Sequence, residues 1–192
     1  EKTRANTETD AMGNIPFAEW QAKHSSVSLA TFVDAVTQSD VVFDALKGEI
    51  ALATLSSLKE MLVGKVLVDI ANPLDFSRGM PPTLLVCNTD SLGEQIQQAL
   101  PETRVVKVFN TLNAELQVEP MKLASGDHSL FVCGNDAEAK RIVSELATGY
   151  GWKHVIDLGD ISAARGTEML LPIWLRLWGA LKTPAFNFKI VQ

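Results

Sequence analysis

The segment that most constrains the fold is Lys65–Asp75, in which a short apolar run leads into Ala-Asn-Pro. Val66–Ile70 is rich in β-branched residues, which is typical of a strand buried on both faces of a parallel sheet. Pro73 has no N–H to donate and restricts Asn72 to an extended conformation, so the strand must end there. The sequence therefore places a small residue and a primary amide at the carboxyl end of a central strand. In open α/β sheets, ligands bind at this edge.

Strands and helices alternate on both sides of this segment. We expect a strand over 40–46 and a helix over 49–62, which with the central strand form a βαβ unit and hence a parallel pair. Further strands are expected over 104–109, 129–133 and 154–158, with helices over 91–100 and 136–148. A strongly apolar helix over 167–181 and a last strand over 186–191 complete the chain. The pattern predicts an α/β fold, a doubly wound parallel sheet with a C-terminal helix-and-strand extension.

Composition and charge exclude several classes of protein. The 192 residues are 46% apolar and 21% charged, which is typical of one globular domain with a sizeable core. A net charge of −6 without basic runs argues against binding of nucleic acid or of an anionic membrane. No run of 18 apolar residues indicates a membrane span. Cys87 and Cys133 are far apart without metal-ligand spacing, so we expect a reduced, cytoplasmic chain rather than a disulfide.

Three of the predicted strands end in polar, loop-forming segments, namely Leu46–Glu49, Ala71–Pro73 and Asn110–Asn113. Because parallel strands end at the same edge of a sheet, we expect these segments to lie side by side. Their amides and hydroxyl can bind a carboxamide and ribose hydroxyls, and Leu46 and Leu112 can contact an aromatic ring. The alternative is that Asn and Pro only terminate strands, as they often do. No hydrolase motif and no metal-ligand spacing is present.

Two terminal features leave alternatives open. Lys2 and Arg4 can bind a phosphate or can belong to a solvated arm. The helix 168–181 is apolar nearly all round and must therefore be covered. Its own domain alone can cover it, or that domain together with a partner subunit, which is the interpretation that we favour.

Several motifs occur together in a familiar order. They are Asp69–Asp75, Asn88–Gln95, Val105–Asn113, Asp157–Asp160 and Ala164–Met169, and then Trp174–Leu181 and Phe186–Lys189 near the end of the chain. In these motifs the chain resembles the NADP oxidoreductase, coenzyme F420-dependent family, and its ending is similar to the bacterial branch of that family. The resemblance extends essentially from Glu1 to Gln192.

The resemblance implies a Rossmann-like domain over 1–160 that binds NADP(H), and a segment 161–192 that completes the second-substrate pocket and a homodimer. Hydride would pass between NADPH and F420, a flavin or another small acceptor, with the rings stacked and no essential protein acid or base. Lys2 matches a basic residue near the adenosine 2′-phosphate. The other implied cofactor-binding residues lie at the three strand ends: Leu46, Lys47, Glu49, Ala71, Asn72, Pro73, Asn110, Thr111, Leu112, Asn113 and Ala114.

In one respect the sequence departs from the family pattern. Members begin with a strand, a Gly-rich turn and a helix, and the turn brings backbone N–H groups to the pyrophosphate. Glu1–Gln192 does not include that unit, and we expect a functional parent protein to contain it. Our expectation is an NADP(H)-dependent oxidoreductase. The alternative is a non-catalytic dinucleotide-binding module that acts as a sensor or partner subunit.

Overall fold

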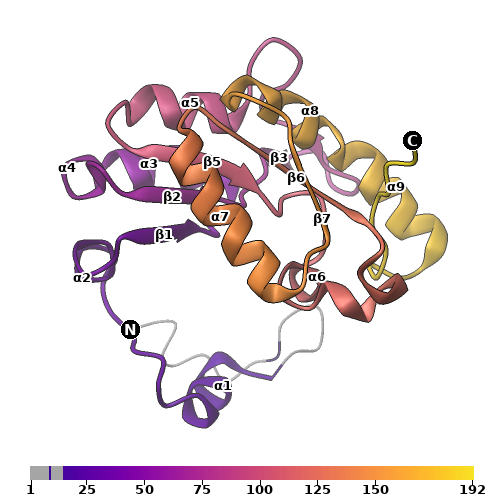
Figure 1. Cartoon of the computed structure of the whole chain (residues 1–192), viewed down its shortest axis with the longest axis horizontal. Coiled ribbons are helices and arrows are strands. Elements are labelled where there is room, and N and C mark those ends of the chain that lie inside the picture. The colour runs from indigo at the N-terminus through magenta and orange to yellow at the C-terminus, as the bar shows by residue number, and fades with distance from the viewer. Residues whose placement is uncertain (1–8, 10–14) are drawn as a thin grey trace. The chain divides into compact units, whose positions relative to one another are not determined.

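The computed structural model describes residue 9 and residues 15–192 (Figure 1). Its contacts divide the chain into two units, 1–35 and 36–192. The first unit contains helix α1 (Phe17–Lys23), on which the Trp20 ring stacks against the His24 ring with centroids 4.3 Å apart. Helix α2 (Phe32–Thr37) spans the division between the units.

The second unit is built on a five-stranded sheet of order β1-β2-β5-β6-β7. Its strands are β1 (Val41–Asp44), β2 (Val66–Asp69), β5 (Arg104–Val108), β6 (Ser129–Gly134) and β7 (His154–Asp157). Strands β1, β2 and β5 are mutually parallel, which confirms the predicted βαβ unit. Their register places Asp69 between Asp44 on β1 and Lys107 on β5.

The sheet is mostly parallel, but β6 runs antiparallel to β5, and β7 is parallel to β6. The prediction of a wholly parallel sheet is wrong at this one pair. A parallel crossover needs a connection long enough to run back along the sheet. Between β5 and β6 the structure has only α6 (Ala114–Val118), η1 (Pro120–Lys122) and η2 (Ala124–Gly126). A five-residue helix rises only about 7.5 Å, so β6 starts at the end where β5 stops.

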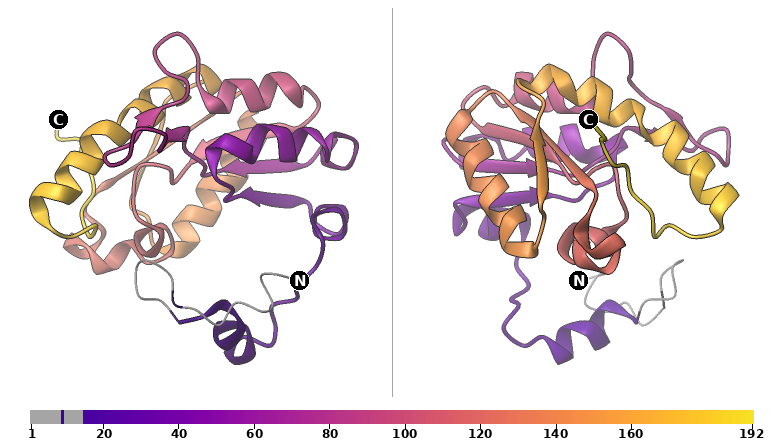
Figure 2. Two further views of the ribbon diagram at one scale, coloured as in Figure 1. Left: turned by 180° about the vertical axis from the view of Figure 1, so that it is seen from behind. Right: turned by 45° about the vertical axis from the view of Figure 1, so that its right-hand side comes forward.

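Helices cover both faces of the sheet, as a doubly wound fold requires (Figure 2). On one face, Leu67 and Val105 pack with α3 (Gly48–Ser56), α4 (Lys59–Leu62), α5 (Leu92–Ala99) and α8 (Ala164–Met169). On the other face, Val66, Val68, Val106 and Val108 pack with α6 and α7 (Ala137–Tyr150). The Rossmann-like fold class is thereby confirmed.

Two long helices expected from the sequence are each divided in the structure. The segment 49–62 forms α3 and α4, with Ser57 and Leu58 between them. The segment 167–181 lies across α8 and α9 (Leu171–Leu181), which meet at Leu170. Pro172 stands in the first turn of α9, where its missing N–H and its ring end the preceding helix.

The predicted strand over 186–191 is not formed. The Ser129 N–H donates to the Phe188 carbonyl at 2.9 Å. The Ile190 N–H, however, donates to the Ser129 side-chain hydroxyl at 3.1 Å. A side-chain acceptor thus replaces the backbone carbonyl that a β-ladder would use, and the ladder does not continue.

The remaining elements are short. Strands β3 (Leu74–Asp75) and β4 (Thr83–Leu84) form an antiparallel hairpin after β2, and η3 (Ile161–Ala163) precedes α8. Cys87 is exposed, Cys133 is buried, and both are free thiols. Within residues 15–192, no helix has the length and apolar character needed to cross a membrane.

Candidate functional site

The carboxyl ends of β1, β2 and β5 lie at one edge of the sheet, which we call the rim: residues 46–49, 71–73 and 110–114. Two asparagines join the second and third parts of the rim. Asn72 Nδ2 donates to the backbone carbonyl of Asn110 at 2.9 Å, and Asn110 Nδ2 donates to Asn72 Oδ1 at 3.0 Å. These reciprocal bonds fix the Asn72 amide plane, and one of its two N–H groups has no acceptor among the residues that the structure describes, so it can donate to a ligand.

A cavity of about 560 Å³ opens beside Asn72, between the loop after β1 and the segment after β2. Its lining is mainly apolar and comprises Ala45, Leu46, Lys47, Gly48, Glu49, Ile70, Ala71, Asn72, Leu74 and Phe76. The volume lies within the range of ordinary small-molecule pockets. An apolar wall with a fixed primary amide at its border is suited to a flat heteroaromatic ring that bears a carboxamide.

Gly48 brings the two sides of this cavity together. A Cβ built on Gly48 would lie 2.1 Å from the carbonyl oxygen of Asn72 and 2.9 Å from the Cα of Pro73. Only glycine permits so close an approach of the first turn of α3 to the rim. Among residue 9 and residues 15–192, no side chain caps the N-terminus of α3, so its first N–H groups are not used by a cap and favour an anionic or polar ligand.

The predicted site residues divide into two groups in the structure. Five of the eleven described ones line the cavity, namely Leu46, Lys47, Glu49, Ala71 and Asn72. The other six do not: Pro73, Asn110, Thr111 and Leu112 are buried, Asn113 caps α6 by accepting the Leu116 N–H at 3.0 Å, and Ala114 is exposed. Leu112 belongs to the core under α7. Lys2 lies outside the described residues.

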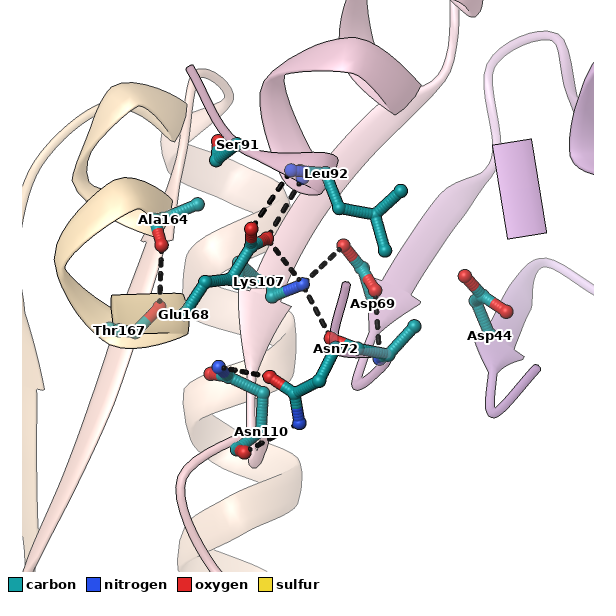
Figure 3. Close-up of polar contacts among 12 residues, drawn as sticks. Asp44, Asp69, Asn72, Ser91, Leu92, Lys107, Asn110, Ala164, Thr167 and Glu168 are labelled. Carbon is teal, nitrogen blue, oxygen red and sulfur yellow. Dashed lines mark hydrogen bonds and ion pairs between the residues drawn. The ribbon is translucent and has the colours of Figure 1, made fainter. Parts of the chain in front are cut away.

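Sequence reasoning missed a buried ionic cluster directly under the rim (Figure 3). The side chain of Lys107 is completely buried, and its Nζ lies 2.9 Å from Asp69 Oδ2 and 2.8 Å from Glu168 Oε1. The same Nζ donates to the carbonyl of Ala71 at 2.7 Å. Glu168 also accepts the backbone N–H groups of Leu92 and Gly93 at 2.9 and 3.0 Å, so it satisfies the start of α5.

Electrostatics favour the charged form of Lys107 but the neutral form of Glu168. Burial lowers the pKa of the Lys107 ammonium, but Asp69 and Glu168 together outweigh it, so that its pKa is raised. Burial raises the pKa of Glu168, while Lys107 opposes the shift. The sequence contains the signal for this cluster. Asp69 and Lys107 each interrupt an otherwise apolar strand, and charged residues are seldom fully buried unless they are paired.

Comparison with known proteins provides independent evidence of the family to which the chain belongs. The model of the family described as NADP oxidoreductase coenzyme F420-dependent matches residues 13–73. The F420-dependent NADP reductase of Methanocaldococcus jannaschii is 37% identical over 161 residues, which is 83% of this chain and 71% of that protein. The chain belongs to this family. It is accordingly an NADP-dependent oxidoreductase, and the family and enzyme class predicted from the sequence are both confirmed.

Two further relatives mark the breadth of the family. The crystal structure of a protein from Arthrobacter sp. FB24, provisionally named an F420-dependent NADP reductase, superposes with a TM-score of 0.94 and 54% identity over 100% of this chain and 84% of that one. The rat metalloreductase STEAP3 is 34% identical over 155 residues, which are 78% of this chain but only 29% of that protein.

In the described part of this chain, no group of three or more His, Cys, Asp or Glu side chains is arranged to hold a metal ion.

Proposed function

We propose that the rim binds the nicotinamide end of NADP(H) and that the enzyme transfers hydride between this cofactor and a deazaflavin of the F420 type. The observation that supports the proposal most directly is the apolar cavity bordered by Asn72, at the edge where parallel sheets bind nucleotides. The names of the relatives from Methanocaldococcus and Arthrobacter support F420 as the acceptor.

The residues at the rim have positioning roles in this proposal. Leu46 and Ala71 contact the ring faces, and the unused N–H of Asn72 donates to the carboxamide. Bound NADPH supplies the hydride. The chain contributes proximity, ring orientation and exclusion of water, and it needs no acid or base at the reacting carbon.

The buried part of the rim supports these contacts from behind. Asn110 orients Asn72, while Thr111, Leu112 and Asn113 fix the path of the chain into α6. Pro73 prevents β2 from continuing, and in this proposal Lys47, Glu49 and Ala114 contact the ribose or pyrophosphate groups. We further propose that Lys2 contacts the 2′-phosphate and sets the preference for NADP over NAD. Lys2→Ala is expected to weaken binding of NADPH but not of NADH.

Titration and rapid kinetics test the proposal. We expect the protein to bind NADPH and to oxidise it in stopped-flow assays with F420. Asn72→Ala should weaken NADPH binding by about tenfold, because it removes a ligand donor and the partner of Asn110. Asn135→Ala is the matched control, since Asn135 accepts the Ile161 N–H at 3.1 Å and does not line the cavity. Absence of NADPH binding in the unsubstituted protein would refute the proposal.

Two alternatives are separated by the same assay. The similarity to a metalloreductase favours ferric complexes as a second class of acceptor, so ferric citrate and FMN are assayed beside F420. A non-catalytic dinucleotide-binding sensor would bind NADPH but would not turn over with any of the three. Turnover with F420 alone supports the proposal, and turnover with ferric citrate alone assigns the other acceptor.

We also propose a homodimer in which the outer face of α9 is covered by a second copy of the chain. Leu171 and Trp174 on α9 are buried, whereas Ile173 and Leu181 are 48% and 53% exposed. Light scattering should give twice the mass of the chain, and Ile173→Glu should reduce it to the monomer mass. A monomeric unsubstituted protein would contradict this assembly.

A further inference from the structure

Asp69 and Lys107, labelled in Figure 3, both hydrogen-bond to the backbone of one rim residue, Ala71. The Ala71 N–H donates to Asp69 Oδ1 at 2.9 Å, and the Ala71 carbonyl accepts from Lys107 Nζ at 2.7 Å. Asp69 and Lys107 are themselves paired at 2.9 Å. A single ion pair therefore binds the donor and the acceptor of the same residue, which lies next to Asn72.

Every donor of the Lys107 ammonium is used in this arrangement. The three N–H groups of a lysine match its three oxygen partners, on Asp69, Glu168 and Ala71. A fully satisfied buried network fixes a single geometry, because any displacement leaves a charged group without a partner. The cluster is thus a rigid support for the segment after β2.

Stability alone does not explain why charges occupy this position. Replacing a buried ion pair by apolar side chains of similar volume is often neutral or stabilising, so charged residues are not needed to fill the space. An apolar side chain at 107 would, however, leave the Ala71 carbonyl without its donor. The specific contribution of Lys107 is the position of that carbonyl.

We propose that Lys107 is a positioning residue of the nucleotide site: together with Asp69 and Glu168, it fixes Ala71 so that Asn72 meets Asn110 and presents its remaining N–H to the ligand. Glu168 is remote in sequence and belongs to α8, so the cluster also links the C-terminal helices to the rim. This inference rests on the proposed nucleotide site.

The test uses a double variant that keeps the net charge of the cluster constant. One ammonium and two carboxylates leave the cluster with one net negative charge. The double variant Lys107→Met/Asp69→Asn keeps that charge, and an amide oxygen at position 69 can still accept the Ala71 N–H. The Lys107→Met substitution removes the donor to the Ala71 carbonyl. Lys140→Met is the matched control, because Lys140 also binds a carboxylate and a backbone carbonyl, on Asp157 and Gly159.

Two readouts distinguish positioning from mere stabilisation, and both are made well below the melting temperature. The dissociation constant for NADPH should rise about tenfold or more in the double variant. Without any nucleotide, the side-chain amide protons of Asn72 should exchange with solvent about tenfold faster by NMR. Lys140→Met should change neither quantity, because β7 is separated from β2 by β5 and β6.

The outcomes are separable. If the unsubstituted protein binds NADPH and the double variant matches it in affinity and in Asn72 exchange, the positioning role is wrong and the nucleotide site stands. If the unsubstituted protein does not bind NADPH, the proposed function fails and the role of Lys107 in the nucleotide site fails with it, while Asn72 exchange still shows whether Lys107 orders Asn72. If the double variant does not fold, the unsubstituted protein is tested by NMR for a scalar coupling between Lys107 Nζ and the Ala71 carbonyl carbon. Presence of the coupling supports the positioning role, and its absence overturns the inference.

Discussion

The ends of β1 and β2 form the same local turn, but their buried aspartates have different partners. Asp44 and Asp69 are partners in the register of these strands, and both are buried. Each accepts the backbone N–H two residues further on, Asp44 from Leu46 at 3.0 Å and Asp69 from Ala71 at 2.9 Å. Each strand therefore ends in the same local turn, which Asp favours.

The two carboxyl groups differ in what faces their second oxygen. Asp69 Oδ2 is paired with Lys107, whereas Asp44 Oδ2 has no hydrogen-bond partner among the described residues. Burial, and after it the neighbouring Asp69, raise the pKa of Asp44 to about 6. The turn alone therefore does not stabilise a buried carboxylate. Asp69 faces the ammonium of Lys107 on the adjacent strand, whereas within the described part of the chain no cation pairs with Asp44.

The largest expected loss of stability comes from removing the cation that pairs with Asp69, so that its carboxyl group is left without a cation, like that of Asp44. Lys107→Met leaves the Asp69 and Glu168 carboxylates buried without their cation. Breaking a buried ion pair in this way costs about 3 to 5 kcal/mol, and we expect that loss in the free energy of unfolding. Denaturation by urea at neutral pH measures it.

Lys140→Met serves as the control for that variant. The Lys140 side chain is 15% exposed and that of its partner Asp157 is 55% exposed, so we expect a loss below about 1 kcal/mol. Equal losses in the two variants would show that burial of the Lys107 pair has no special energetic consequence, and the contrast between the strand ends would then fail.

Asp44→Asn tests the energetic effect of the buried carboxyl group at the end of β1. A folded-state pKa near 6, above the ordinary 3.8, means that the folded protein holds the Asp44 proton more tightly than the unfolded chain. The stability associated with this proton is present below pH 3.8 and is lost as the pH rises through 6. The variant has no such loss, so we expect it to be more stable by about 2 to 3 kcal/mol at pH 7.5. Urea denaturation between pH 4 and 7.5 measures the difference.

Asp160→Asn provides a control of opposite sign. Hydrogen bonds from the side chain and then the backbone of Ser162 lower the pKa of Asp160, so its contribution is present above the ordinary pKa and is lost as the pH falls. The advantage of Asp44→Asn should grow with pH, whereas the deficit of Asp160→Asn should shrink toward acid pH. A pH-independent effect of Asp44→Asn would show that the pKa of Asp44 is the same in the folded and unfolded states.

Gly48→Ala tests whether the two strand ends must touch. The added Cβ meets the Asn72 carbonyl, which is backbone and cannot swing aside. We expect a loss of about 1 to 2 kcal/mol from this overpacking, with weaker NADPH binding. In Gly166→Ala the Cβ meets nothing within 4 Å on the exposed face of α8, so that variant should gain up to about 1 kcal/mol. Thermal melts with and without NADPH compare Gly48→Ala with Gly166→Ala. Equal stability of the two variants would contradict the close approach of Gly48 to the Asn72 carbonyl.

Much of the fold was predictable, because its signals are local. The β-branched run before Asn72 marks β2, which ends at Asp69, and the Asn-Pro pair prevents the strand from continuing. The direction of β6 was not predictable, since it depends on how far the β5–β6 connection travels. The tail 186–191 has a strand-like pattern, but the Ser129 hydroxyl, which no pattern in the tail reveals, takes the Ile190 N–H.

The candidate site was predictable only in part. Parallel strand ends must share an edge, so the meeting of Asn72 with Asn110 follows from the order of the strands. Which rim residues face the cavity depends on side-chain direction, and Leu112 turns into the core. The partnership of Lys107 with Glu168 joins residues 61 positions apart in the sequence. Each charge alone indicates a need for a partner, but only the packing of α8 against α5 identifies it.

The smallest expected effect completes the contrast between buried and exposed charges. Arg141 resembles Lys107 in bridging two carboxylates, those of Glu138 and Glu145, but its side chain is 53% exposed whereas that of Lys107 is fully buried. In water the ions lose little solvation when separated, and ordering long side chains offsets their attraction. We expect Arg141→Ala to leave the urea midpoint unchanged within error in high salt, with at most a slight decrease in low salt. A loss as large as that of Lys107→Met would show that bridging two carboxylates, rather than burial, determines the energetic importance of such a cation, and the distinction between Asp44 and Asp69 would need another cause.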